Sequence, residues 1–335
     1  MTHVLFDLRM VRGPLHGIAR YALELARRIP TLEPGWQFSG LTGPDGLPGD
    51  LGELTPRFPL HRCAAEFLSP FEQPALMTAL MKARADLFHA TSFSLPVLWP
   101  GRFVGTIHDA THVALGASAS KQAYYELIVR PGARRARALI TVSSFSRAEI
   151  ARHLRLEPER LQVIANGVDA MFRRPAESAL DDFRARRGLP AQYFAAIGSA
   201  KAHKNLQVLR PVAAQLGAPL VLLAGRGARR ELGFDERVIE LAPLPDADLI
   251  NFFAASTAVL FPSRYEGFGL PALEAMACGA PVLAAHAGAL PEVVGAQGQL
   301  LSPDDPKAWQ QAAQRMLRDP QHRAQCVEHG LERAA

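Results

Sequence analysis

The sequence predicts an α/β protein built from two doubly wound parallel-sheet domains. Short apolar runs of strand length alternate with helical patterns through both halves of the chain, which is typical of parallel sheets. Glycine-rich or polar segments follow several of these runs, at the carboxyl ends of strands where such folds bind ligands. A length of 335 residues suits two domains of this kind.

The first half contains six predicted strands, at residues 4–6, 38–41, 86–90, 102–108, 138–142 and 162–165. Residues 18–29 follow a loop with glycine and place their apolar side chains on one helical face. A helix is expected at about 120–137. Another is expected from about Ser146, with Ser144 as its cap.

The character of the sequence changes around residues 170–190, where a polar, arginine-containing stretch ends in Gly188-Leu-Pro190. This stretch predicts an interdomain connection, so we expect domains at 1–172 and 173–335. Strands then resume at residues 193–197, 220–224, 238–241, 258–261 and 282–284, with helical segments between them.

Composition narrows the protein class. The three cysteines are widely separated, which favours a reducing compartment. The sequence shows no run of about 18 apolar residues and no signal-peptide pattern. Together these observations predict a cytoplasmic protein. The first 175 residues hold 21 Lys and Arg against 15 Asp and Glu. Contact with anionic lipid head groups and plain solubilising charge both explain this excess. No nucleic-acid-binding pattern is present.

A strand, a glycine turn and a helix are predicted around the stretch Arg264-Tyr-Glu-Gly-Phe-Gly-Leu-Pro-Ala-Leu-Glu274. Leu270-Pro271 suits a helix start, and the free N–H groups and dipole of such a start favour phosphate. Glu266 would lie in the turn and Glu274 about one turn into the helix. On spacing alone, a nucleotide site and two solvated glutamates both remain open.

With the following Ala275-Met-Ala-Cys-Gly-Ala-Pro-Val282, this stretch resembles the signature of the retaining family 4 glycosyltransferases. The likeness runs from Gly17 to about Pro306. It implies the GT-B architecture, in which two Rossmann-like domains face each other across a cleft. It also implies transfer of a hexose, with mannose favoured, from a GDP- or UDP-linked donor to a glycan or lipid-linked acceptor. No metal and no cofactor besides the donor are expected.

The resemblance assigns roles around the glycine turn. Glu274 binds the ribose hydroxyls of the donor, because a carboxylate accepts two hydrogen bonds from a diol. Glu266 contacts the transferred sugar, and Leu244 adjoins the base. Backbone N–H groups near phosphate or sugar oxygens belong to Gly267, Phe268, Gly269 and Leu270.

A second motif, Gly198-Ser-Ala-Lys-Ala-His-Lys-Asn205, follows the predicted strand 193–197. By the same resemblance, Lys204 stabilises the leaving diphosphate, which is electrostatic catalysis. Ser199 stands where the family often has arginine, and Lys201 is the candidate to replace that cation. Ordinary solvated lysines are the alternative.

Two motifs of the first half also match the family. In Thr106-Ile-His-Asp109, His108 resembles the active-site histidine that contacts the transferred sugar, with a structural histidine as the alternative. His16-Gly-Ile-Ala-Arg-Tyr21 resembles the N-terminal glycine-rich loop, and Gly17 permits close approach of donor or acceptor.

Other functions remain open at this stage. A sugar-nucleotide epimerase or a non-catalytic nucleotide-sugar binder could share this architecture. The helix expected at 120–137 interleaves aromatic and basic residues. It is either a surface that docks on the inner face of the cell membrane, as in related enzymes, or an ordinary helix with one face in the core.

Overall fold

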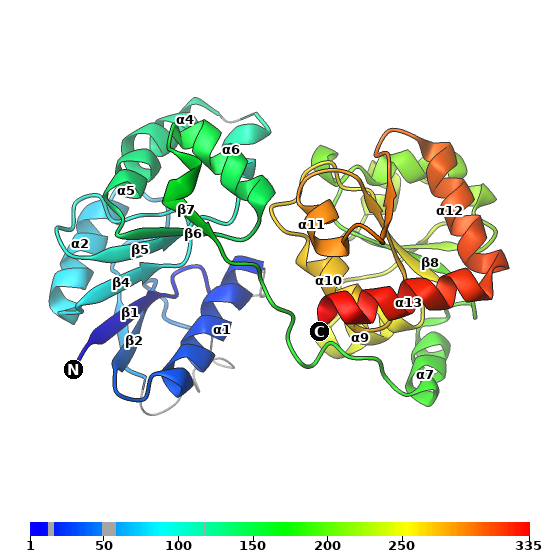
Figure 1. The fold of residues 1–335 in the computed structure, drawn as a ribbon, viewed down its shortest axis with the longest axis horizontal. Helices are drawn as coiled ribbons and strands as arrows, with labels where there is room; N and C mark the ends of the chain where they lie inside the picture. Colours follow the sequence, from blue (N-terminus) through cyan, green and yellow to red (C-terminus); the bar gives the residue numbers. More distant parts are fainter. Residues whose placement is uncertain (13–16, 49–57, 117) are drawn as a thin grey trace. The chain divides into compact units, whose positions relative to one another are not determined.

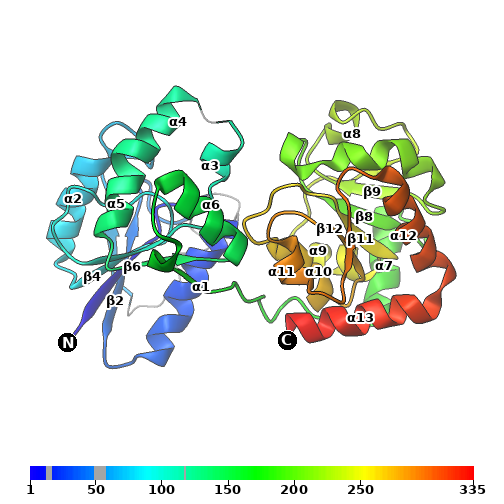
Figure 2. The same cartoon turned by 45° about the horizontal axis from the view of Figure 1, so that its top comes forward.

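The computed structural model describes residues 1–12, 17–48, 58–116 and 118–335 (Figure 1). Its contacts divide the chain into two compact units, Met1–Ala165 and Asn166–Ala335. The division lies a few residues before the expected boundary at residue 172. Each unit is a parallel sheet flanked by helices, as Figures 1 and 2 show.

The sheet of the first unit has strand order β3-β2-β1-β4-β5-β6-β7, and every neighbouring pair is parallel. Its strands are β1 (His3–Asp7), β2 (Gln37–Thr42), β3 (Leu60–Arg62), β4 (Leu87–Ala90), β5 (Phe103–Thr106), β6 (Ala138–Thr141) and β7 (Leu161–Val163). Successive side chains of β1 pack into different apolar clusters. Val4 and Phe6 belong to one apolar cluster and Leu5 to another, so helices cover both faces of the sheet.

The helices of the first unit are α1 (Gly17–Leu32), α2 (Glu72–Ala83), α3 (Thr111–Ala114), α4 (Ala119–Tyr124), α5 (Arg130–Arg135) and α6 (Ser144–Leu154). A π-helical segment, Tyr125–Val129, joins α4 to α5. The expected cap of α6 was wrong by one residue. Ser143, not Ser144, caps it, because the Ser143 hydroxyl accepts the N–H of Ser146 at 2.9 Å.

The aromatic residues of the α4–α5 region point inward. Tyr125 is buried, and the Tyr124 hydroxyl donates to Glu72 Oε2 at 3.0 Å. Arg135 donates to the carbonyl oxygens of Val97 and Trp99. The tyrosines therefore lie on the core side of this region.

The sheet of the second unit has strand order β10-β9-β8-β11-β12-β13, again parallel throughout. Its strands are β8 (Phe194–Ile197), β9 (Leu220–Leu223), β10 (Ile239–Glu240), β11 (Ala258–Phe261), β12 (Val282–Ala285) and β13 (Gln299–Leu301). Residues of β8, β9, β11 and β12 form the centre of one large apolar core.

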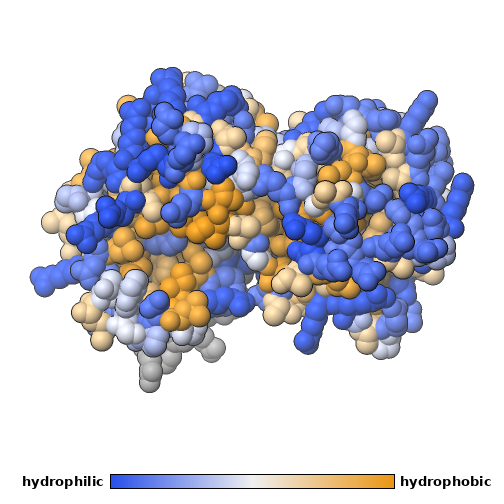
Figure 3. All heavy atoms as spheres, viewed as in Figure 1, coloured by the Kyte–Doolittle hydropathy of each residue, from blue (hydrophilic) through white to orange (hydrophobic). Residues whose placement is uncertain are grey.

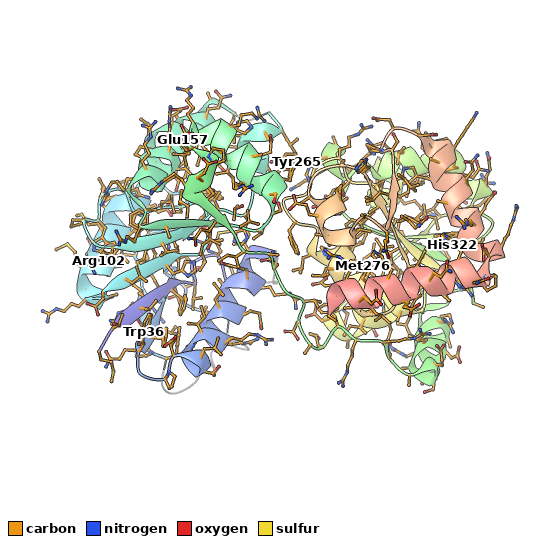
Figure 4. All side chains as sticks on the ribbon, in the orientation of Figure 1. Trp36, Arg102, Glu157, Tyr265, Met276 and His322 are labelled. Carbon is orange, nitrogen blue, oxygen red and sulfur yellow. The ribbon has the colours of Figure 1, made fainter. Side chains whose placement is uncertain are left out.

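The helices of the second unit are α7 (Glu177–Arg187), α8 (Ala228–Glu231), α9 (Asp246–Ala254), α10 (Leu270–Ala277), α11 (Leu290–Val294), α12 (Pro306–Arg318) and α13 (Pro320–Ala334). The stretch 170–190, expected as an interdomain connection, instead contains α7, which belongs to the second unit and buries Leu180 and Phe183 in its core. The helix after β8 is of the 3-10 type, Leu206–Gln215, and it contains Pro211. Met276 of α10 lies beneath α13 (Figure 4), where it meets Gly330.

The strand order reverses direction between β1 and β4 in the first unit and between β8 and β11 in the second. In doubly wound sheets, ligands bind beside the carboxyl ends of the strands at such a reversal. The loops after β8 and β11 carry the predicted lysine and glutamate motifs. Among the described residues, no helix is both long and apolar enough to cross a membrane.

Candidate active site

Lys204 and Glu266 meet at the strand reversal of the second unit. Lys204 Nζ lies 2.8 Å from Glu266 Oε1 and 2.9 Å from Oε2. The side chains remain 25% and 12% exposed, so the pair is sheltered but reachable. The loop after β8 and the loop after β11 thus bring together two residues that the sequence predicted separately.

Asn205 holds these loops in place. It is buried and has φ 53°, a left-handed conformation that asparagine tolerates better than most residues. Its side-chain amide donates to the carbonyl oxygens of Pro262 at 3.0 Å and Pro303 at 2.8 Å. These carbonyls belong to the loops after β11 and β13. Asn205 therefore fixes the backbone from which the side chain of its neighbour Lys204 extends toward Glu266.

The turn before α10 depends on glycine. Gly269 precedes the helix with φ 98°, and an added Cβ would lie 2.8 Å from Leu290 Cδ2. No side chain caps α10. Pro271 has no N–H, and the N–H groups of Ala272 and Leu273 donate to the Gly269 carbonyl oxygen at 2.9 and 3.4 Å. The N–H groups of Phe268, Gly269 and Leu270 are therefore the candidates to bind a ligand. Glu266 is fixed at the other end of the turn, because its carbonyl oxygen accepts the N–H of Ala289 at 3.1 Å.

Glu274 lies one turn inside α10 and is buried. Cys278 follows one turn later, and its N–H donates to the Glu274 carbonyl oxygen at 3.0 Å. Burial, followed by the negative charge of Glu274, raises the pKa of Cys278 to about 12. Glu266 and Glu274 thus come from one turn and the helix that follows it, as the spacing predicted.

The other predicted residues of the second unit occupy the loops around this pair. Ser199 is half-buried after β8, whereas Lys201 is exposed just before the short 3-10 turn Ala202–Lys204. Gly267 is buried in the turn. Three partly buried residues pack against the core: Leu244, Phe268 and Leu270.

In the first unit, His108 follows β5 and is half-buried. Its Nε2 lies 2.9 Å from the carbonyl oxygen of Thr91, so Nε2 carries a proton. The ring of Tyr21 meets the imidazole edge-on, with 4.7 Å between centroids. Asp109 Oδ1 accepts the N–H of Thr111 at 2.8 Å, which orders the local turn.

A hydrogen-bonded chain supports Tyr21. The Tyr21 hydroxyl lies 3.0 Å from Thr106 Oγ1, which lies 2.9 Å from His89 Nε2. Burial is the main cause that lowers the pKa of His89 to about 4; the charge of His108 adds to it, and Asp7 opposes it. His89 is therefore neutral at physiological pH and acts as a structural partner.

A buried ionic network that the sequence analysis missed lies behind His108. Arg9 donates to Asp7 Oδ2 at 2.7 Å and to Glu72 Oε1 at 2.8 Å, with both carboxylates buried. The Thr91 hydroxyl in turn donates to the Asp7 carbonyl oxygen at 2.5 Å. The carbonyl oxygen of Thr91 accepts the hydrogen bond from His108 Nε2. The network therefore fixes the backbone that orients the histidine.

Gly17 is exposed at the first position of α1, and a Cβ added there would meet nothing within 4 Å. Packing within the described residues therefore does not require glycine at this position. His16 of the same motif lies outside the described residues.

Each half of the chain matches a known family of proteins. The family model "Glycosyltransferase Family 4" matches residues 15–172, and "Glycosyl transferases group 1" matches residues 182–333. O-antigen chain mannosyltransferase B of Escherichia coli is 31% identical, over 99% of this chain and 94% of that protein. The MMP alpha-(1->4)-mannosyltransferase of Mycolicibacterium hassiacum is 34% identical, over 60% of this chain and 50% of its own length.

Solved structures agree on the fold. Sucrose-phosphate synthase from Thermosynechococcus elongatus matches with a TM-score of 0.80 and 21% identity, covering 100% of this chain and 94% of that one. The Anabaena protein HepE, in complex with UDP and glucose, matches with a TM-score of 0.80 and 20% identity, covering 100% and 95%. These relatives and both family models lead to one conclusion: the chain belongs to glycosyltransferase family 4 and has the GT-B fold.

Proposed function

We propose that this glycosyltransferase moves mannose from GDP-mannose to a hydroxyl of a cell-surface glycan or its lipid-linked precursor, with retention of the anomeric configuration. Two relatives that exceed 30% identity are named mannosyltransferases, one of them for an O-antigen chain. The UDP and glucose bound to HepE support a nucleoside diphosphate sugar as the donor class.

The contact between Lys204 and Glu266 beside the start of α10 is the observation that carries this proposal. An ammonium group has three N–H donors, and the two contacts with Glu266 account for two of them. The third N–H is proposed to meet a phosphate oxygen of the donor. The N–H groups of Phe268, Gly269 and Leu270 and the dipole of α10 are proposed to add to the same anion site.

In the proposed reaction, the acceptor hydroxyl attacks the anomeric carbon from the face that the diphosphate leaves. The bond from the anomeric carbon to the phosphate oxygen breaks, and the acceptor proton passes to that oxygen. Lys204 and the N–H groups of Phe268, Gly269 and Leu270 stabilise the charge that develops on the diphosphate. Glu266 and His108 position the sugar, while Glu274 holds the ribose.

Contact with the inner face of the membrane remains a proposal. The tyrosines of the α4–α5 region are excluded from it, because they are directed into the core. The exposed Lys121, Leu127, Arg134 and Arg137 are the groups of this region that could meet anionic head groups. Cosedimentation with phosphatidylglycerol vesicles tests this surface, and loss of binding in a Lys121, Arg134 and Arg137 triple alanine variant is expected.

Product analysis tests the proposed function. The protein is incubated with GDP-mannose or UDP-glucose, with and without an α-mannoside acceptor, and products are identified by NMR of the anomeric protons. We expect an α-linked mannoside from GDP-mannose only when acceptor is present. A new GDP-sugar without acceptor would identify an epimerase, and tight donor binding without any product would identify a binding protein. A β-linked product would contradict retention.

A further inference from the structure

A groove of about 760 Å³ opens on the first unit, where α1 ends and β1 and β2 begin. Its volume lies in the range of small-molecule sites. The lining comes from α1, the turn after it and the first three strands: His3, Ala26, Arg27, Pro30, Thr31, Pro34, Trp36, Gln37, Phe38, Ser39, Phe58, Pro59 and His61. We call it the α1–β2 groove. Figure 4 labels Trp36 at this place, and Figure 3 shows apolar side chains on this face of the first unit.

A row of aromatic rings supports the groove. Trp36 is 43% exposed and stacks on Phe38, with 6.4 Å between the ring centroids. Phe38 stacks on Phe6 at 5.9 Å, and Phe6 stacks on Phe58 at 6.3 Å. The exposed indole face is thus held by rings that belong to the core, so a ligand meets a platform that is already ordered.

The polar groups of the lining are mostly uncharged. Burial, followed by the charge of His3, lowers the pKa of His61, so its imidazole is neutral at neutral pH. Gln37 adds an amide, and the Thr31 hydroxyl, which donates to the carbonyl oxygen of Arg28 at 2.7 Å, can still accept a hydrogen bond. Among the described lining residues, histidines aside, Arg27 alone carries a formal charge, and it pairs with Glu24 at 3.3 Å.

This chemistry selects a class of ligand. A phosphate-bearing ligand would need several converging cations, and an acyl chain would offer no partner to the Gln37 amide or the His61 imidazole. A neutral sugar offers an apolar C–H face for an indole ring and hydroxyls for the neutral donors and acceptors around it.

The groove is distant from the residues of the first unit that belong to the candidate active site. Gly17 starts α1 and Pro30 and Thr31 lie near its end. A helix of 16 residues is about 24 Å long. A ligand that reaches from the glycine-rich loop to the groove must therefore contain several sugar units.

We propose that the α1–β2 groove binds a neutral oligosaccharide segment of the acceptor, remote from the end that receives the new sugar. This inference rests on the proposed function, because it assumes a glycan acceptor. The groove would hold a long acceptor near the enzyme between transfers, whereas a short acceptor would not reach it.

Intrinsic fluorescence gives a test that does not require turnover. The chain has three tryptophans, of which Trp99 is 6% exposed and Trp309 is 0% exposed, so acrylamide quenching reports mainly on Trp36. A mannose hexasaccharide is expected to protect Trp36 from quenching in wild type and in the control Met81→Ala, whose side chain is exposed on α2. The protection is expected to be lost in His61→Ala. Absence of protection in wild type, or protection by phosphatidylcholine vesicles in its place, would overturn the proposal.

Kinetics with two acceptors separate this inference from the proposed function. Trp36→Ala is expected to raise KM for the hexasaccharide about tenfold, or about 1.4 kcal/mol, as for loss of an aromatic anchor. The KM for a single α-mannoside should not change. If neither acceptor is used by wild type, the proposed function fails while the quenching result stands by itself. Equal changes in KM for both acceptors would contradict the proposal that the α1–β2 groove binds the acceptor oligosaccharide.

Discussion

Lys204 shows what a sequence motif can and cannot predict for a single side chain. Its motif placed a cation after a strand, and the structure confirms that loop position. The contact with Glu266 joins residues separated by 62 positions, and no local spacing encodes such a distance. The Arg9, Asp7 and Glu72 network escaped prediction for the same reason, since Arg9 and Glu72 are 63 positions apart.

Removal of the Lys204 charge should lower turnover strongly. Loss of one group that stabilises a developing anion costs about 2–4 kcal/mol, so Lys204→Ala should reduce kcat about 30- to 1000-fold. Steady-state kinetics with the donor and acceptor measure this change. Lys82→Ala, at an exposed lysine of α2, serves as the control and should keep the wild-type kcat. A normal kcat for Lys204→Ala would remove this residue from the mechanism.

His89 should make stability depend on pH. Its pKa is about 4 in the folded protein against an ordinary 6.5, so between these values the unfolded chain binds the additional proton. The free energy of unfolding is therefore expected to fall as pH drops from 6.5 to 4, with a total loss of about 3 kcal/mol from this residue.

Urea denaturation over this pH interval compares wild type with His89→Gln. The variant has no group that titrates at this position, so its free energy of unfolding should decline less steeply. Parallel declines of the two proteins would show that His89 is not the cause.

At the scale of elements, strand–turn–helix units were the most predictable part. β11 and α10 were predicted correctly from the apolar run, the glycine turn and the helix start at Leu270-Pro271. The edge strands β3 and β13 were missed, because each has three residues and is too short to form an extended apolar run. α7 was taken for a connection, since its polar sequence buries just Leu180 and Phe183.

The loops that carry the candidate site depend on Asn205. Asn205→Gly permits the φ of 53° but removes both amide hydrogen bonds. Loss of partners for these carbonyl groups should lower the free energy of unfolding by about 2–4 kcal/mol and weaken donor binding. Arg84→Gly is the matched control, because Arg84 has φ 49° and is exposed. Equal stability of the two variants in urea denaturation would contradict this role.

At the scale of the molecule, alternation of strands and helices was enough to predict two doubly wound units. Each unit has its own apolar core and its own reversal of strand order. The family resemblance, not the periodicity, supplied the activity, because doubly wound sheets serve many reactions. The sugar and the acceptor depend on side chains that no motif specifies.

Nucleotide-dependent stability of the second unit is the measurement that tests the central claim most directly. Unfolding is followed with GDP, UDP or ADP for wild type, Glu274→Ala and the control Glu328→Ala on α13. We predict that GDP at 100 times its dissociation constant stabilises wild type and the control by about 2.7 kcal/mol, and that Glu274→Ala loses this gain. Equal stabilisation of Glu274→Ala, or no stabilisation of wild type by any nucleotide, would contradict a donor site at α10.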